Sequence, residues 1–122
     1  MAEHNEIGKI GEDIALNYLK RLGYNILEQN WRYKQFELDL LALDGNTLVV
    51  VEVKTRKSDT FGTPEVFVDR KKQQFLIRAV NEYVISKSME HEIRFDIISV
   101  IYGYGLQKVE HIKDAFYPVL KR

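Results

Sequence analysis

The sequence predicts a single α/β domain in which helices flank a mixed central β-sheet. Two segments repeat apolar residues at helical spacing, and five segments have the apolar character of strands. The two kinds follow one another in the order α-β-β-β-α-β-β, which is typical of a sheet covered by helices. The chain of 122 residues is long enough for one hydrophobic core, and no Pro/Gly/Ser-rich linker divides it. We therefore expect residues 1–122 to form one domain.

Residues 3–22 are expected to form the first helix, because apolar residues recur there at helical spacing and Gly23 is a natural C-terminal stop. Residues 24–32 follow as a partly amphipathic strand. The next two strands, 36–43 and 47–55, are strongly apolar and are separated only by the turn sequence Asp-Gly-Asn. This pattern predicts a β-hairpin.

The second half of the chain begins with a polar loop at 56–68 that contains a glycine and a proline. Asp69 can then cap a second amphipathic helix that runs to about Lys87. The remaining expected elements are a strand at 94–102, a turn at 103–105, a strand at 107–112 and an irregular tail from 114 to 122.

The composition excludes several classes of function. Eighteen Lys and Arg residues balance eighteen Asp and Glu residues, so the chain does not coat polyanions through bulk positive charge. A local basic surface is still compatible with this balance. The chain has no cysteine, which excludes disulfides and Cys-ligated metal sites. Without a signal core or a long apolar run, it is expected to be a soluble, cytoplasmic domain that does not enter a membrane.

Charged residues interrupt both apolar strands of the hairpin. Because side chains alternate between the faces of a strand, Glu37 shares a face with Asp39, and Glu52 shares a face with Lys54. A turn that pairs residues whose numbers sum to 91 places Asp39 opposite Glu52 and Glu37 opposite Lys54. A two-residue turn at 44–45 would oppose Glu37 and Glu52 instead, and an odd-length turn would break the arrangement. The other face of the first strand is expected to carry Leu38, Leu40 and Ala42.

Carboxylates that face each other within a sheet repel, so an uncompensated pair is costly. A divalent cation compensates them, because Mg²⁺ and Mn²⁺ accept one or two carboxylates together with water and substrate phosphate. Lys54 would lie beside that ion, where it could stabilise an anionic transition state or orient a hydroxide. The alternative is a structural ion-pair network on an exposed sheet edge.

The spacing from Asp39 to Glu52-Val53-Lys54 resembles the PD-(D/E)xK nuclease superfamily, whose restriction-endonuclease-like fold carries metal carboxylates and a lysine on a β-hairpin. The wider sequence resembles the YraN-like bacterial family, which is similar to archaeal Holliday junction resolvases. This resemblance covers nearly the whole chain, through GKIGEDIALNYLKRLGYNILEQNWR, FELDLLALDGNTLVVVEVKTRKSDTFGTPEV, RKKQQ and RFDIISV. It implies a restriction-endonuclease-like fold and a metal-dependent nuclease.

The resemblance also assigns roles to individual residues. It implies that Asp39, Glu52 and Glu12 hold Mg²⁺ or Mn²⁺ and that Lys54 is the catalytic lysine, while Glu37 supports the site. Glu12 lies at the edge of the apolar arc of the first helix and can therefore point toward the sheet. A solvated glutamate on the helix face is the alternative.

Basic residues follow the acidic hairpin and are expected to surround it as a phosphate-binding rim, with a solvated surface as the alternative. Gln73 matches the family's RKQ segment, which suggests that it binds phosphate or positions Lys54, or that it is a simple polar residue of the first helical turn. The expected rim consists of Arg56, Lys57, Arg70, Lys71, Lys72 and Gln73.

Other aromatic and titratable residues have less specific interpretations. Trp31, Tyr33 and Phe61 are expected either to cover a small core or to stack on unpaired bases. Asp96 is expected to be a structural partner of Arg94 or of a helix terminus in preference to a fourth site carboxylate. The three histidines show no metal-ligand spacing and are expected at the surface: His4, His91 and His111.

These features predict a Mg²⁺- or Mn²⁺-dependent endonuclease that acts on DNA, with branched or damaged DNA as candidate substrates. RNA is an alternative substrate. A non-catalytic nucleic-acid-binding or assembly module that keeps the fold is the alternative function. The joint presence of Asp39, Glu52 and Lys54 favours the enzyme, because a binding surface does not need buried acids. The likeness to the resolvases also makes a homodimer an expectation, although no residue pattern in the chain supports it.

Overall fold

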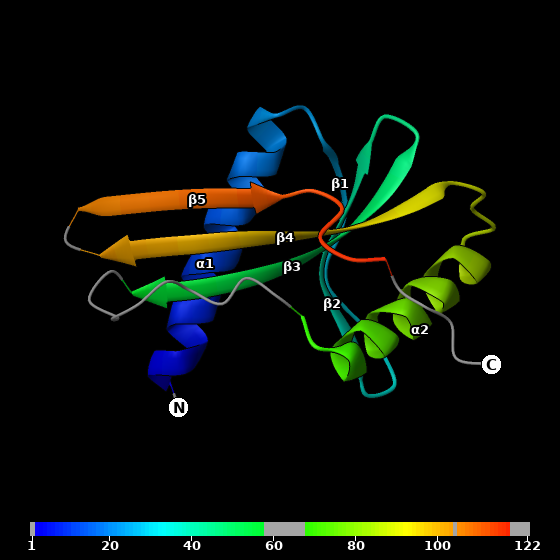
Figure 1. Ribbon diagram of the computed structural model, residues 1–122, viewed down its shortest axis with the longest axis horizontal. Coiled ribbons are helices and arrows are strands. Elements are labelled where there is room, and N and C mark those ends of the chain that lie inside the picture. Colours follow the sequence, from blue (N-terminus) through cyan, green and yellow to red (C-terminus); the bar gives the residue numbers. More distant parts are fainter. Residues whose placement is uncertain (1, 58–67, 104, 118–122) are drawn as a thin grey trace.

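The computed structural model describes residues 2–57, 68–103 and 105–117. Figure 1 shows its helices and strands. They are α1 (Ala2–Arg21), β1 (Asn25–Tyr33), β2 (Phe36–Asp44), β3 (Thr47–Lys57), α2 (Arg70–Ser86), β4 (Glu92–Gly103) and β5 (Leu106–Ile112). This order confirms the predicted α/β fold class and the α-β-β-β-α-β-β sequence of elements. Neither of the two helices in these ranges has the length and hydropathy that a membrane span requires.

The five strands form one mixed sheet in the order β1-β2-β3-β4-β5. Neighbouring strands are antiparallel except β3 and β4, which are parallel. Parallel strands need a long crossover, and α2 lies in the segment that connects β3 to β4. The α2 crossover therefore carries its helix onto the sheet beside the hairpin.

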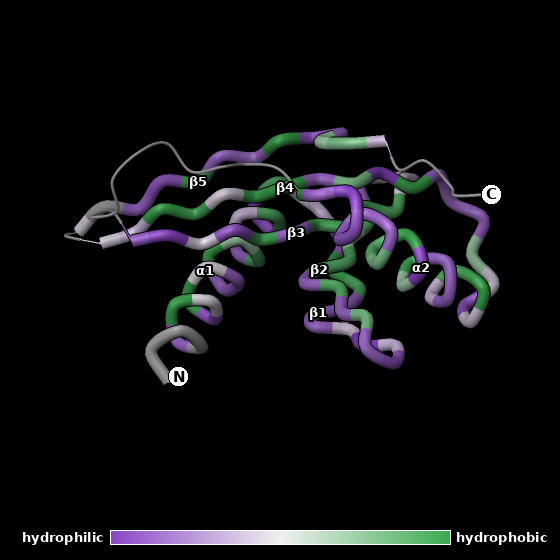
Figure 2. Tube along the Cα trace, turned by 60° about the horizontal axis from the view of Figure 1, so that its bottom comes forward, coloured by the Kyte–Doolittle hydropathy of each residue, from purple (hydrophilic) through white to green (hydrophobic). Residues whose placement is uncertain are grey.

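Two hydrophobic cores lie on opposite faces of the sheet. Alternate residues of β3 separate them, because Val49 and Val51 pack with α1 whereas Leu48 and Val50 pack with α2. Hydrophobic residues recur along β4 and both helices, as Figure 2 shows. A sheet covered on both faces explains why the two hairpin strands are apolar on both sides.

The β2 strand changes core part-way along its length. Leu38 packs in the core on the α2 side, whereas Leu40 packs in the core on the α1 side. The prediction that Leu38, Leu40 and Ala42 share one face was therefore wrong. The opposing strand explains the change, because Asn30 lies between the pairs Gln29–Leu40 and Trp31–Leu38 and has a left-handed φ of 50°. The β1–β2 ribbon is irregular at this level, and an alternation argument assumes a regular strand.

α1 lies close to the sheet at Gly11. A Cβ at this position would overlap the side chain of Thr55 in β3, so only glycine fits without movement. The next residue, Glu12, is consequently held beside the sheet.

α2 begins where the sequence predicted. Asp69 is its N-cap, and the Asp69 carboxylate accepts a hydrogen bond of 2.8 Å from the backbone N–H of Lys72. The cap sets the rotation of the first helical turn and hence the direction of its basic side chains.

Candidate metal and nucleic-acid site

The hairpin register places two acids at a fork between β2 and β3. The strands pair from Asp44–Thr47 to Leu40–Val51, so each pair of numbers sums to 91 as predicted. Beyond Leu40–Val51 the ladder ends, and the backbone N–H of Val53 donates to the Asp39 carboxylate at 2.9 Å. A side chain thus takes the place that a strand carbonyl would have in a continuous ladder.

The carboxyl groups of Asp39 and Glu52 meet at this fork. Burial, together with a hydrogen bond to Glu52 and the charge of Glu52, raises the pKa of Asp39 to about 8, against the opposing effects of the Val53 N–H and Lys72. The Glu52 side chain is only 8% exposed. Two carboxyls in hydrogen-bond contact cannot both ionise cheaply, so the metal-free pair retains a proton over much of the neutral range.

Lys72, rather than Lys54, supplies the positive charge next to these acids. Its Nζ lies 3.4 Å from Glu52 Oε2, and its side chain is 44% exposed. The sequence assigned Lys72 to the phosphate-binding rim. Helical periodicity could have predicted its inward direction, because Lys72 precedes the buried Leu76 and Ala79 by four and seven residues. Lys72 therefore shares the inner stripe of α2 with core residues.

Lys54 lies on the same face of β3 as Glu52, about 7 Å farther along the strand. Its side chain is half-buried. Within the described ranges, Lys54 has no hydrogen bond or ion pair, and its β4 neighbour in the register is Ser99. Among the described residues, none therefore competes with a ligand at the fork for this ammonium group.

Glu12 approaches the same acids from α1. Asn30 Nδ2 donates to Glu12 Oε2 at 3.1 Å. Burial, opposed by this hydrogen bond, raises the pKa of Glu12, and the nearby charges of Asp39 and Glu37 raise it further. Glu12 is thus within electrostatic reach of the pair, as the sequence predicted for an acid on the sheet side of the helix.

Glu37 has a different partner from the predicted one. Strand pairing ends before Glu37 and Lys54 could oppose each other, so that prediction was wrong. Arg32 Nη2 lies 3.2 Å from Glu37 Oε2, and these two residues are register partners across β1 and β2. The twist of the β1–β2 ribbon explains the change, because it carries Glu37 away from β3.

The described residues contain no group of three or more His, Cys, Asp or Glu side chains arranged to hold a metal ion. Glu12 therefore does not complete a three-ligand set with Asp39 and Glu52 in this conformation. The pair itself nevertheless suits a hard divalent cation. Mg²⁺ is commonly held by one or two carboxylates while water and substrate phosphate complete its coordination.

Comparison with known proteins gives the family. Residues 11–100 match the family described as "Uncharacterised protein family UPF0102". The chain belongs to the UPF0102 family. It is 53% identical over 117 residues to a UPF0102 protein of Flavobacterium psychrophilum, in a match that covers 96% of this chain and 98% of that protein. It is also 48% identical over 120 residues to one from Bacteroides thetaiotaomicron, covering 98% and 99% of the two chains.

A more divergent UPF0102 protein, from Thermodesulfovibrio yellowstonii, is 44% identical over 112 residues, which are 92% of this chain and 96% of that one. These matches confirm the resemblance to the YraN-like family. The matched UPF0102 region begins in α1 and ends in β4, so it includes Glu12, both acids at the fork, Lys54 and Lys72.

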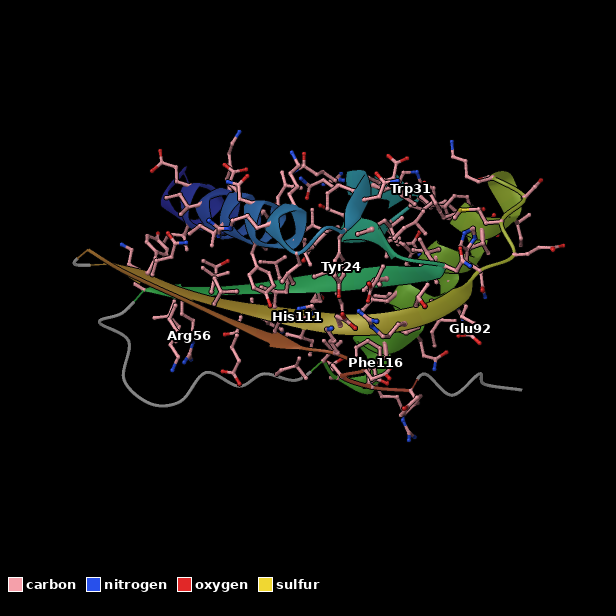
Figure 3. The ribbon with its side chains drawn as sticks, turned by 90° about the horizontal axis from the view of Figure 1, so that it is seen from above. Tyr24, Trp31, Arg56, Glu92, His111 and Phe116 are labelled. Atoms are coloured by element: carbon pink, nitrogen blue, oxygen red, sulfur yellow. The ribbon has the colours of Figure 1, made fainter. Side chains whose placement is uncertain are left out.

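The residues of the predicted basic rim lie in several different environments in this UPF0102 structure. Arg56 is half-buried, points away from α1 (Figure 3), and has an Nη1 atom that is buried without a hydrogen-bond partner. Lys57 is exposed at the end of β3, and Arg70 and Lys71 are exposed on α2. Gln73 instead donates from Nε2 to the Val68 carbonyl at 2.8 Å. This contact favours the reading of Gln73 as a polar residue of the first helical turn.

The aromatic residues of β1 cover the core. Trp31 stacks on Tyr33 with ring centroids 6.4 Å apart, and its ring meets Tyr83 edge-on at 5.2 Å. Both β1 aromatics are partly buried against the α2-side core. These contacts favour the core-covering reading. Phe61, the third candidate for base stacking, lies outside the described residues.

A buried polar network confirms the predicted role of Asp96. Its carboxylate accepts two hydrogen bonds of 2.9 Å from Arg94 and lies 2.8 Å from His111 Nε2. Burial opposes ionisation of Asp96, but hydrogen bonds from His111, Arg94 and the Asp114 backbone outweigh burial and lower its pKa. Arg94 also reaches Asp44 at 3.0 Å.

The prediction that His111 is a surface residue was wrong. Its side chain is 4% exposed, because the hydrogen bond to Asp96 satisfies one ring nitrogen. Tyr18 Oη lies 3.2 Å from the other nitrogen, and Tyr24 packs edge-on against the ring (Figure 3). His91 is half-buried rather than exposed, and the side chain of His4 lies outside the described residues.

Proposed function

We propose that this UPF0102 protein is a metal-dependent nuclease of the PD-(D/E)xK type that hydrolyses phosphodiester bonds, in DNA rather than RNA. One observation carries the proposal: the carboxyl groups of Asp39 and Glu52 meet at a fork in a strongly apolar sheet, where the pKa of Asp39 is raised to about 8.

Such a pair is costly for a protein that uses it only for stability. Replacing a buried charged cluster by apolar residues of similar volume is often neutral or stabilising. Strongly shifted pKa values also concentrate at functional sites, where the shift serves the chemistry. The fork therefore supports a functional role for Asp39 and Glu52.

The residues around the fork have different roles in the proposed reaction. Asp39 and Glu52 supply oxygen ligands. Glu12 is a further acid near them, and its side chain is oriented by the hydrogen bond from Asn30. Mg²⁺ or Mn²⁺, when bound, would polarise the phosphate and lower the pKa of a bound water. Lys54, with no partner among the described residues, would bind a phosphate oxygen and stabilise the charge that develops on it.

The Lys72–Glu52 contact supports the second candidate function, a nucleic-acid-binding module without catalysis. Lys72 balances the acids without any metal, so the site is electrostatically compatible with a metal-free protein. The two functions differ in one respect that can be measured, because only the nuclease requires the acids to bind a divalent cation.

The test incubates the purified protein with single-stranded, duplex, flapped and four-way DNA and with RNA, in Mg²⁺ or Mn²⁺. Asp39→Asn and Lys54→Met should abolish cleavage, whereas Asp13→Asn should leave it unchanged. Asp13 is the matched control because it is an exposed acid on α1 beside Glu12. Mn²⁺ binding is measured in parallel. A wild-type protein that neither binds Mn²⁺ nor cleaves any substrate would leave the binding module as the function.

A further inference from the structure

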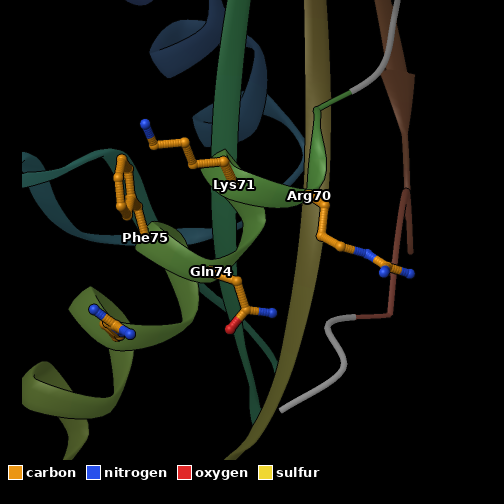
Figure 4. Close-up of a pocket in the computed structure, with 5 residues that line it drawn as sticks. Arg70, Lys71, Gln74 and Phe75 are labelled. Carbon is orange, nitrogen blue, oxygen red and sulfur yellow. The ribbon is translucent and has the colours of Figure 1, made fainter. Parts of the chain in front are cut away.

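The outer face of α2 carries a pocket that is separate from the fork. Figure 4 shows its lining side chains, and the pocket has a volume of about 440 Å³. This volume lies within the ~300–1,000 Å³ range of ligand sites. The described lining residues are Arg70, Lys71, Gln74, Phe75 and Arg78.

The lining has the chemistry of a nucleic-acid site. Three of its five described residues are cations with exposed side chains, and none is acidic. Phe75 is half-buried, since it packs against Phe36 with ring centroids 5.2 Å apart, and the ammonium group of Lys71 lies 5.9 Å from its ring. An aromatic ring flanked by cations suits a base that stacks and phosphates that pair with the charges.

The pocket lies next to the fork along the same helix. Lys72, which contacts Glu52, immediately follows Arg70 and Lys71 in the chain. The stripe from Arg70 to Arg78 extends about 12 Å along the helix axis at 1.5 Å per residue.

We propose that this pocket binds an unpaired, single-stranded segment of nucleic acid that continues from the phosphate at the fork. The inference rests on the proposed function, whose substrate class it names. A duplex keeps the faces of its bases stacked on one another, so no base can stack on Phe75 unless the strands separate. An unpaired strand can place a base against Phe75 and its phosphates against the three cations.

The experiment measures binding without catalysis. A fluorescently labelled single strand of about 12 nucleotides, within the ~4–16 nucleotide range of small sites, is titrated by anisotropy in EDTA at several salt concentrations. A duplex of the same sequence is the second probe. Arg78→Ala and Phe75→Leu are compared with Arg21→Ala, an exposed arginine of α1 outside the pocket.

Arg78→Ala should weaken binding of the single strand about five-fold at about 0.1 M salt and reduce the salt slope by about 0.7, the value for one lost phosphate contact. Phe75→Leu should weaken binding about five-fold or more without a change of slope, and should spare the duplex. Arg21→Ala should match wild type. Urea unfolding of each variant reports whether it is folded.

Three results would overturn the proposal. Arg78→Ala could bind the single strand as tightly as Arg21→Ala does, or the wild-type protein could bind no single strand. Phe75→Leu could also weaken binding of the duplex as much as binding of the single strand. If Phe75→Leu does not fold, Arg78→Ala decides the question, since Arg78 is exposed. Failure of the proposed nuclease is distinguishable, because EDTA removes the metal.

Discussion

Lys72 Nζ lies 3.4 Å from Glu52 Oε2, so the helix within the β3–β4 crossover balances an acid on the strand that precedes it. The pair connects α2 to the hairpin fork at the point where the sheet carries its buried carboxyls. A metal ion that binds Asp39 and Glu52 would compete with this ammonium group for the same negative charge. The contact therefore links the charge state of α2 to metal binding.

Lys72→Met should make the metal-free protein less stable and bind Mn²⁺ more tightly. The loss of the ion pair should lower the free energy of unfolding by about 1 kcal/mol, a small value because Lys72 is 44% exposed and solvent screens its charge. Urea unfolding in EDTA and Mn²⁺ titration measure the two effects. Lys71→Met, an exposed neighbour on the outer face of α2, is the control. Weaker Mn²⁺ binding by Lys72→Met would show that the lysine assists the ion instead.

Asp39→Asn should remove a pH dependence of stability from the metal-free protein. The pKa of Asp39 is about 8 in the folded protein and 3.8 for an unperturbed aspartate, so the folded chain holds a proton that the unfolded chain releases between these values. The stabilisation is therefore present below about pH 4 and is lost as the pH rises to about 8.

The asparagine of this variant cannot ionise, so Asp39→Asn should be more stable than wild type at about pH 9, and its profile should be flatter. Urea midpoints in EDTA at about pH 6 and about pH 9 give the comparison. Asp13→Asn serves as the control on an exposed acid. Parallel profiles for Asp39→Asn and wild type would refute a shared proton at the fork.

Gly11→Ala should destabilise the fold, because its Cβ would overlap the Thr55 side chain where α1 meets β3. Overpacking of this kind costs about 1–3 kcal/mol. Gly8→Ala is the matched control in the same helix, since a Cβ there has no neighbour within 4 Å. Alanine at position 8 should stabilise α1 by about 0.5–1 kcal/mol. Equal urea midpoints for the two variants would contradict the close approach at Gly11.

Asp96→Asn should destabilise the protein without changing Mn²⁺ affinity. Removing the charge of Asp96 breaks its buried ion pair with Arg94, and breaking a buried ion pair costs about 3–5 kcal/mol. The network packs on the α1 side of β4, and among the residues that the structure describes it shares no hydrogen bond with the acids at the fork. Urea unfolding and Mn²⁺ titration test the two parts, and a large loss of Mn²⁺ affinity in the folded variant would link the network to the site.

The hairpin shows how much of the site was predictable from the sequence. The turn at Gly45 and Asn46 is short, and Gly45 has the positive φ of 62° that such a turn favours. A short turn determines the register of both strands, so the meeting of Asp39 and Glu52 followed from local chemistry. The order of the elements followed in the same way from periodicity.

Contacts between elements that are distant in the chain could not be predicted from these local patterns. The inward direction of Lys72 depends on the rotation of α2 after its cap, and the burial of His111 depends on Asp96 in the neighbouring strand. Glu37 pairs with Arg32 because the β1–β2 register places these two residues opposite each other, beyond the last pair of the β2–β3 ladder.

Local patterns in the chain therefore specified the order of the elements and the two acids at the hairpin fork, because turn geometry and side-chain alternation act over a few residues. Three outcomes came from tertiary packing instead: which cation balances those acids, which histidine is buried and which face of β2 enters which core. These outcomes depend on how a helix or strand is rotated against a partner distant in the chain, and no local pattern specifies that rotation.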